Sequence, residues 1–252
     1  MSNLSFVTLA AYDYPYLINS ISLYYPIAEE IIVGLDRDRI SYSHKPFDFD
    51  TADFQRRLLA LDRDRKIRVI EDDFHCRETP MGNETYERNV LSELCKPGNW
   101  VVQVDADEYM VNADEFYQWM RGLQTNDVLV LANWVTVFKS FGTQHLVIDT
   151  FEPFDGVIPL ATKRRGSYYE ARTILDQPTA RSPLILAHFA WGRHREELRQ
   201  KLTHWSHSRD FDTDRYLAMW DSVTLENYGQ FKDFHPIYPP YWRALKPFEI
   251  VL

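Results

Sequence analysis

The chain has 252 residues, 45% hydrophobic and 26% charged, so it can bury a core without disulfides or a structural metal. Its 28 basic and 37 acidic side chains give a net charge of −9, which argues against general binding to a phosphate polymer such as nucleic acid. Both signs of charge are interspersed, which excludes long disordered segments. Aromatic residues make up 15% of the chain, and they serve carbohydrate stacking as readily as a core.

The sequence predicts a cytoplasmic protein. Two cysteines, Cys76 and Cys95, are too few for a disulfide framework and fit a reducing compartment. The first residues lack the basic stretch of a signal peptide, and no apolar run approaches the ~18 residues of a membrane span. The aromatic tail at 238–242 leaves peripheral membrane contact open.

The first half of the chain alternates apolar strands with amphipathic helices. Strands are expected at 4–11, 30–35, 66–70, 100–104 and 128–138. Helices are expected around 17–25, 86–94 and 112–123. Because helices separate the strands, a mostly parallel sheet with right-handed crossovers is the simplest architecture. The predicted fold class is therefore doubly wound α/β.

The second half breaks into shorter pieces. A buried strand is expected at 184–190, an amphipathic helix at 195–206, and an irregular aromatic strap after Tyr228. The chain contains no repeat, linker or low-complexity segment. One domain over residues 1–252 is predicted, with halves of about 1–138 and 139–252.

Acidic residues follow four of the expected strands. They are Asp13, Asp36, the pair Asp72 and Asp73, and the pair Asp105 and Asp107. In open α/β sheets, ligands bind beyond the carboxyl ends of the strands. Carboxylates gathered there need a metal or a hydroxyl-rich ligand to offset their repulsion.

One Asp-x-Asp pair stands out among six. The pairs start at 36, 48, 62, 105, 210 and 212, but only those at 36 and 105 follow an apolar strand. Only the second is followed directly by a glutamate, Glu108. Asp105 and Asp107 share one side of an extended segment, so together they suit a hard divalent cation.

The passage around this pair resembles glycosyltransferase family 2 and its GT-A relatives. Arg88-Asn89 on a helix, a Pro-Gly turn, and Trp100 at the start of a strand leading into DADE at 105–108 match that family's passage closely over 84–110. The first two strands and their spacing agree as well, so the resemblance covers about residues 4–138. The segment HFAWGRHREELRQKLTHWSHS at 188–208 resembles the family's closing histidine segment more loosely.

The resemblance implies a single-domain GT-A glycosyltransferase that uses a nucleotide diphosphate sugar. It implies UDP-hexose as the expected donor and Mn²⁺ or Mg²⁺ as the cofactor. Nucleotide-sugar binding would fall in about residues 1–138. Acceptor binding would fall in about 139–252, which includes a C-terminal helix and the aromatic tail. A saccharide or glycolipid, such as a surface glycan, is the expected acceptor.

The resemblance also assigns residues to the donor. The loop after the first strand, with Ala11 and Tyr12, would contact the nucleobase, and Asp36 would bind base or ribose. Arg88 would face the nucleotide, and Asp105 with Ala106 would lie near ribose and metal. The family usually has D-x-S-x-D where this chain has DRDR at 36–39, so the base stays open.

The cation would be held by three residues. The resemblance implies Asp107 as the ligand bridging to the diphosphate, with Asp105 beside it and His188 as the third ligand. A mixed carboxylate and imidazole site suits Mn²⁺ better than Mg²⁺ or Ca²⁺. His188 alone also suits a core histidine, and both interpretations stay open.

Two further groups are candidates from their chemistry alone. Lys163, with the two arginines after it, offers a cationic clamp on phosphates, although three basic residues before a glycine also suit a solvated loop. An inverting transfer needs a carboxylate base, for which Glu152, Asp155 and Glu170 are candidates. A retaining transfer would need none.

Three other functions are less consistent with the residues. A phosphohydrolase of the haloacid dehalogenase type shares Asp-x-Asp, but Tyr109 stands where that family has Thr or Val. A sugar-phosphate nucleotidyltransferase should have a Gly-rich loop after the first strand, and residues 10–13 are not one. A non-catalytic sugar-binding module would not need Arg88, Asp105 and Asp107 together.

Overall fold

The computed structural model describes residues 3–150, 156–204 and 210–249. It divides into two compact units, one made of Met1–Asn133 and Ile158–Ile185, the other of Trp134–Val157 and Leu186–Leu252. The first unit thus takes up a segment that the sequence assigned to the second half. A single domain over 1–252 stays a prediction.

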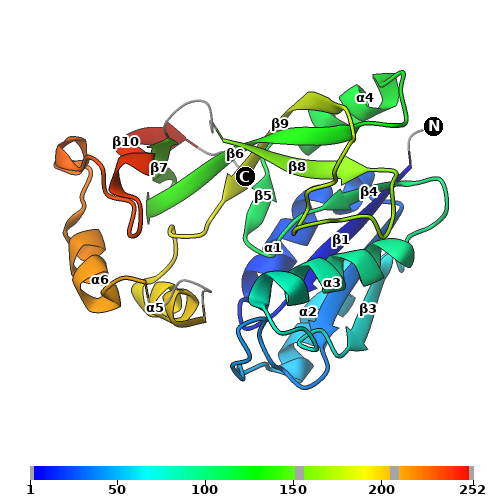
Figure 1. The fold of residues 1–252 in the computed structure, drawn as a ribbon, viewed down its shortest axis with the longest axis horizontal. Helices are drawn as coiled ribbons and strands as arrows, with labels where there is room; N and C mark the ends of the chain where they lie inside the picture. The colour runs from blue at the N-terminus through cyan, green and yellow to red at the C-terminus, as the bar shows by residue number, and fades with distance from the viewer. Residues whose placement is uncertain (1–2, 151–155, 205–209, 250–252) are drawn as a thin grey trace. The chain divides into compact units, whose positions relative to one another are not determined.

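Four parallel strands form the centre of the first unit (Figure 1). They lie in the order β3-β2-β1-β4. Their bounds are β1 (Leu4–Ala10), β2 (Glu30–Asp36), β3 (Ile67–Asp72) and β4 (Trp100–Gln103). β8 (Val157–Thr162) pairs antiparallel with β4. The expected fold class, α/β with a mostly parallel central sheet, is confirmed.

Helices separate these strands in the chain. They are α1 (Tyr14–Tyr24), α2 (Thr51–Leu61), α3 (Pro80–Glu93) and α4 (Ala113–Gly122). Local chemistry sets where they begin: Asp50 accepts a hydrogen bond from the Asp53 amide at α2, and Thr79 accepts one from the Gly82 amide at α3. Three of the four helices were expected, and α2 was missed because only two of its residues are buried.

The central strand β1 is apolar on both faces because helices cover both. Val7 packs in a cluster with Leu91 of α3 and Val101 of β4. Its neighbour Phe6 points the other way and stacks on Tyr24 of α1, with 4.4 Å between ring centroids. Figure 1 shows α3 lying across the strands. A parallel sheet buried in this manner reads as a continuous apolar run.

Three further strands extend the first unit. β5 (Glu108–Met110) pairs with β9 (Thr179–His188), and β9 also pairs with β6 (Leu129–Phe141). β6 and β9 each continue into the second unit, at residues 134 and 186 respectively.

The second unit is built around aromatic side chains. β7 (Gln144–Thr150) pairs antiparallel with β10 (Trp242–Glu249) and with β6. Two helices, α5 (Arg195–His204) and α6 (Thr213–Ser222), complete it with short 3₁₀ turns at Tyr228–Gln230 and Pro239–Tyr241. Trp191, Trp220 and Trp242 are buried in one cluster. Much of the high aromatic content is therefore core.

The expectation of an irregular strap after Tyr228 is wrong for the last part of the tail. Residues 242–249 form β10, and Pro247 pairs in register with Leu146. Proline is tolerated there because β10 ends the strand order and needs no donor on its outer side. In the described part of the chain, no helix is long and apolar enough to cross a membrane.

Gly34 of β2 lies directly against helix α3. A Cβ atom at this position would collide with the Glu87 carboxyl and with Leu91 of α3. Gly34→Ala should lower the free energy of unfolding by about 1–3 kcal/mol, the usual cost of overpacking a core. Urea denaturation measures it. Gly122→Ala, where a Cβ meets nothing within 4 Å, is the matched control, and equal stability of the two variants would contradict this packing.

Candidate active site

The carboxyl ends of β1 and β4 bring the predicted donor loops together. β2 and β3 lie on one side of β1 and β4 lies on the other, so the chain order reverses between β1 and β4. Open α/β sheets bind ligands at such a switch point. The loop with Ala11 and Tyr12 leaves β1, and the segment with Asp105 leaves β4.

Two buried arginines hold Asp105. Arg88 of α3, whose side chain is 1% exposed, donates to Asp105 Oδ1 over 2.7 Å. Arg172 lies 2.6 Å from Asp105 Oδ2. Both carboxylate oxygens are therefore ion-paired. The side chain of Asp105 itself is still 31% exposed, so one edge of this buried cluster reaches the surface.

The same arginines hold two glutamates. Arg88 donates to Glu84 Oε1 over 2.8 Å, one helical turn earlier on α3. Arg172 donates to Glu108 Oε1 over 2.8 Å and to the Gln103 carbonyl over 3.3 Å. Charges this deeply buried must be paired and hydrogen-bonded to be tolerated. The cluster thus joins α3, the end of β4 and the loop that carries Arg172.

Asp105 and Glu108 close a tight turn between them. The Glu108 amide donates to the Asp105 carbonyl over 3.0 Å, and the Asp105 amide donates to Glu108 Oε2 over 2.8 Å. Ala106 and Asp107 occupy the two central positions, and both are buried. Asp107 is thus held in place by a turn that is itself tied to two arginines.

Electrostatics keep Asp105 ionised. Burial opposes its charge, but Arg172 and Arg88 outweigh burial and hold the pKa of the Asp105 carboxyl well below its usual range. It therefore serves as a permanent anion that orders the turn. Each of its oxygens already contacts a guanidinium, so a cation bound by Asp105 would share that oxygen with an arginine.

Asp36, predicted to bind base or ribose, organises two loops. Its Oδ1 accepts from the amides of Asp38 and Ile40, and its Oδ2 accepts from the Phe74 amide. The second oxygen also contacts His75 Nδ1 over 2.8 Å. Burial opposes ionisation of Asp36, but these hydrogen bonds outweigh it and lower the carboxyl pKa.

His75 completes a group that the sequence did not assemble. Ligand atoms of Asp36, Asp73 and His75 all lie within 4.8 Å of one another, as in a carboxylate and imidazole metal site. Asp73 was noted as a strand-end acid, whereas nothing in the sequence marked His75. The contacts of Asp36 account for this group without a metal, because four hydrogen bonds use the acceptor sites of a carboxylate.

Ala11, Tyr12 and Lys163, which were predicted to contact the nucleotide sugar, make local contacts in the structure. The Ala11 carbonyl accepts from the Tyr14 amide at the start of α1, and the Tyr12 ring meets Phe47 edge-on with centroids 6.3 Å apart. Lys163 Nζ lies 5.4 Å from the centre of the Trp100 ring. Their roles in nucleotide binding stay predictions.

The candidate base residues and the predicted third metal ligand lie on different segments of the chain. Glu170 is exposed on the loop before Arg172. Asp155 and Glu152 lie outside the described residues. His188 belongs to the second unit, where it stacks on Trp134 with 4.6 Å between ring centroids. Its part in a metal site with Asp105 and Asp107 stays a prediction.

Helix α3 also carries a buried acid, Glu87, directly before Arg88. Glu87 is 4% exposed and accepts a hydrogen bond from the Tyr42 hydroxyl over 2.7 Å. Burial raises the pKa of the Glu87 carboxyl to about 8. This carboxyl is therefore largely protonated at neutral pH.

Sequence reasoning also missed Arg172 and Glu108. Glu108 was recognised as part of the DADE passage but was given no role. Arg172 carries no local signal, because its partners lie 64 and 67 positions earlier in the chain.

Comparisons with known proteins give fold-level likenesses. No family model matches the sequence, and no curated protein matches it. Among solved structures, S. aureus TarS 1-349 is 13% identical, with a TM-score of 0.44 over 90% of this chain and 77% of that one. GalNAc-T7 with UDP, GalNAc and Mn²⁺ is 9% identical, with a TM-score of 0.44 over 89% of this chain and 52% of that one.

UDP-glucose pyrophosphorylase complexed with UDP-glucose is 10% identical, with a TM-score of 0.31 over 75% of each chain. At TM-scores of 0.44 and below, the likenesses carry no argument about activity. The chain spans about half of the GalNAc-T7 chain.

Removing Arg172 tests the buried cluster. Arg172→Met should lower the free energy of unfolding by about 3–5 kcal/mol, because Asp105 and Glu108 would keep their buried charges and lose a partner. Chemical denaturation at neutral pH measures this. Arg164→Met removes a half-exposed pair with Asp127 and should cost less than about 1 kcal/mol. Equal losses in both variants would contradict a stabilising role for Arg172.

Glu87 predicts a pH dependence of stability. The pKa of the Glu87 carboxyl in the folded protein lies above the ordinary 4.5. The carboxyl therefore contributes fully to the free energy of unfolding below about pH 4.5, and this contribution is lost as pH rises through about 8. Within this window the loss approaches about 1.4 kcal/mol per pH unit. Glu87→Gln should flatten the dependence and gain relative stability at alkaline pH. Exposed Glu93→Gln on the same helix is the control, and a wild-type pH profile in Glu87→Gln would refute the shift.

Proposed function

We propose that this chain is a metal-dependent glycosyltransferase. It would move a hexose from a nucleotide diphosphate sugar, with UDP-hexose as the first candidate, to a saccharide or glycolipid acceptor. The carrying observation is the turn at 105–108, which lies at the switch point of a parallel sheet and is fixed by Arg88 and Arg172. A phosphate-bearing ligand is bound best where the binding groups are held rigid beforehand.

The charge balance of the turn supports a cation. Arg88 and Arg172 supply two positive charges, whereas Glu84, Asp105, Asp107 and Glu108 supply four negative ones when ionised. The surplus negative charge favours a divalent cation over a bare diphosphate. This distribution also reconciles a protein of net charge −9 with a phosphate-bearing substrate.

Asp107 would hold the cation, with Asp105 beside it and His188 as the predicted third ligand. Carboxylate and imidazole donors suit Mn²⁺, and Mg²⁺ is the alternative. When bound, the cation would offset the negative charge that develops on the departing nucleoside diphosphate. Arg88 and Arg172 would keep Asp105 ionised and oriented throughout, so the turn would not have to rearrange during transfer.

The acceptor hydroxyl would need its own groups. In an inverting transfer a carboxylate takes the proton of the attacking hydroxyl, and Glu152, Asp155 and Glu170 are the candidates. Glu170 is exposed two residues before Arg172, on the loop tied to Asp105. We infer that Glu170 is the stronger candidate because of this tie.

Nucleotide binding tests the donor assignment. Thermal unfolding is measured with UDP, GDP and CDP, each with and without Mn²⁺. At a ligand concentration about a hundred times Kd, binding adds about 2.7 kcal/mol of stability, so a rise of several degrees is expected only with Mn²⁺. Asp107→Asn should abolish the rise. Asp64→Asn, at the exposed second aspartate of the Asp-x-Asp pair that starts at 62, should retain it.

The donor assignment would be overturned if no nucleotide raised the melting temperature in the presence of Mn²⁺. It would also be overturned if Asp107→Asn showed the same rise in melting temperature as the wild type. Product analysis separates the enzyme classes. UDP-glucose incubated with Mn²⁺ and an acceptor should release UDP. Formation of UTP on addition of pyrophosphate would instead identify a nucleotidyltransferase.

A further inference from the structure

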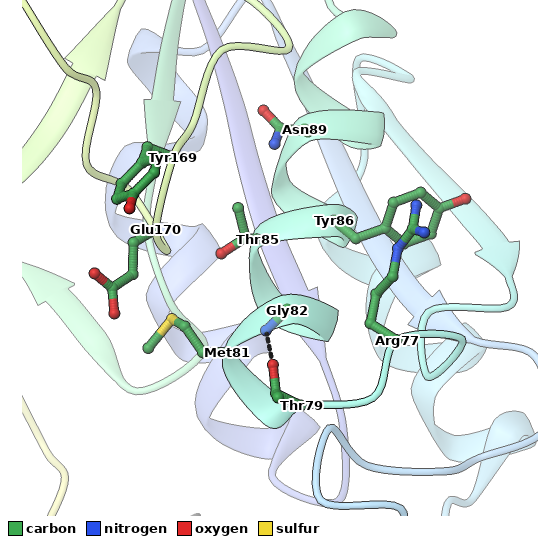
Figure 2. Close-up of a pocket in the computed structure, with 9 residues that line it drawn as sticks. All are labelled: Arg77, Thr79, Met81, Gly82, Thr85, Tyr86, Asn89, Tyr169 and Glu170. Atoms are coloured by element: carbon green, nitrogen blue, oxygen red, sulfur yellow. Dashed lines mark hydrogen bonds between the residues drawn. The ribbon is translucent and has the colours of Figure 1, made fainter.

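A cavity of about 530 Å³ lies in the first unit between α3 and the segment at 169–170 (Figure 2). Met81, Thr85 and Asn89 line it from α3, and Tyr169 and Glu170 line it from the loop opposite. This volume falls within the range of small-molecule sites in proteins. None of the donor residues assigned above lines it.

The cavity and the acidic turn share one helix. Met81, Thr85 and Asn89 are spaced four residues apart and form one row along α3. Glu84 and Arg88 form the adjacent row, which holds Asp105. A ligand in the cavity would therefore lie against the same helix that orders the turn.

The loop side of the cavity is rigidly attached to this helix. The Ala171 amide donates to Thr85 Oγ1 over 2.8 Å. Asn89 bonds both backbone groups of Tyr168: its Nδ2 donates to the carbonyl over 2.9 Å, and its Oδ1 accepts from the amide over 2.8 Å. Arg172 then ties the loop to Asp105. The cavity is thus preformed.

Its exposed side chains have a distinctive chemistry. Tyr169 is 67% exposed and Met81 is 42% exposed, so both present apolar surface to solvent at this cavity. Glu170 adds hydrogen-bond acceptors beside them, and the Thr85 hydroxyl can still donate. Arg77, whose guanidinium lies 4.3 Å from the centre of the Tyr86 ring, carries the one positive charge of the lining, and Glu170 carries the one negative charge. The lining is therefore close to neutral.

These groups match an uncharged ring that has apolar C–H faces and hydroxyls around its edge. An aromatic ring covers the C–H face of a sugar, and a carboxylate accepts its hydroxyl hydrogens. A nucleoside diphosphate would need cations, and among the lining residues only Arg77 supplies one.

We propose that this cavity is a saccharide-binding subsite, with Tyr169 as the stacking platform and Glu170 as the hydroxyl acceptor. If the chain is the glycosyltransferase proposed above, on which this inference rests, the subsite receives the acceptor saccharide. The loop from Tyr168 to Arg172 then serves two purposes: its first part contacts the acceptor, and its last residue fixes the turn that serves the donor.

Saccharide binding without nucleotide tests this subsite directly. Saturation-transfer NMR is recorded with lactose, maltose, cellobiose and N,N′-diacetylchitobiose. At least one disaccharide should bind. Tyr169→Ala should weaken that binding roughly tenfold, equivalent to about 1.4 kcal/mol, whereas Tyr169→Phe, which keeps the ring, should bind like wild type. Glu170→Ala should also weaken binding.

Tyr238→Ala is the matched control, because Tyr238 is similarly exposed but belongs to the second unit. Binding of no disaccharide, or unchanged binding in Tyr169→Ala and Glu170→Ala, would overturn the subsite. The Mn²⁺-dependent rise in melting temperature caused by nucleotide is measured on the same protein variants. If disaccharides bind but no nucleotide raises the melting temperature with Mn²⁺, the proposed transferase function is overturned and the saccharide subsite stands. If nucleotides raise the melting temperature but no disaccharide binds, only the subsite is overturned.

Discussion

The sharing of one carboxylate between two buried guanidiniums is the interaction on which the candidate site depends. Removing Arg88 and Arg172 from water is costly, and the cost is offset only where oppositely charged oxygens occupy well-formed positions around them. Asp105 supplies one oxygen to each, and Glu84 and Glu108 supply the others. Because an unpaired buried charge is so unfavourable, the partners cannot separate without a large energetic penalty.

This constraint orders parts of the chain that are distant in sequence. Arg88 comes from α3, Asp105 from the end of β4, and Arg172 from a loop beyond β8. The ion pairs join these segments at the carboxyl end of β4 and fix them relative to one another. The same contacts position Asp107 and the loop from Tyr168 to Arg172 that lines the cavity. The proposed donor and acceptor sites thus share one support.

The sequence predicted most of the first unit because its signals are local. Apolar runs mark β1 and β2, and the Lys96-Pro97-Gly98 breaker separates α3 from β4. Asp105 and Asp107 were found because a rigid apolar strand precedes them. Arg172 could not be found, since its role exists only once the fold brings it to Asp105. β10 was missed because the Pro- and aromatic-rich passage at 235–242 suggests irregular chain. The strand that follows it contains Pro247, which an outer strand tolerates.

The aromatic core of the second unit has a spectroscopic consequence. Five of the seven tryptophans fall within its sequence ranges, and Trp191, Trp220 and Trp242 are packed together there. Most of the fluorescent side chains therefore belong to the second unit, whereas Asp107 and Tyr169 belong to the first. A fluorescence-detected melting curve reports ligands of the first unit only to the extent that both units unfold cooperatively. Of the two first-unit tryptophans, Trp100 lies within β4 itself and is the natural local reporter.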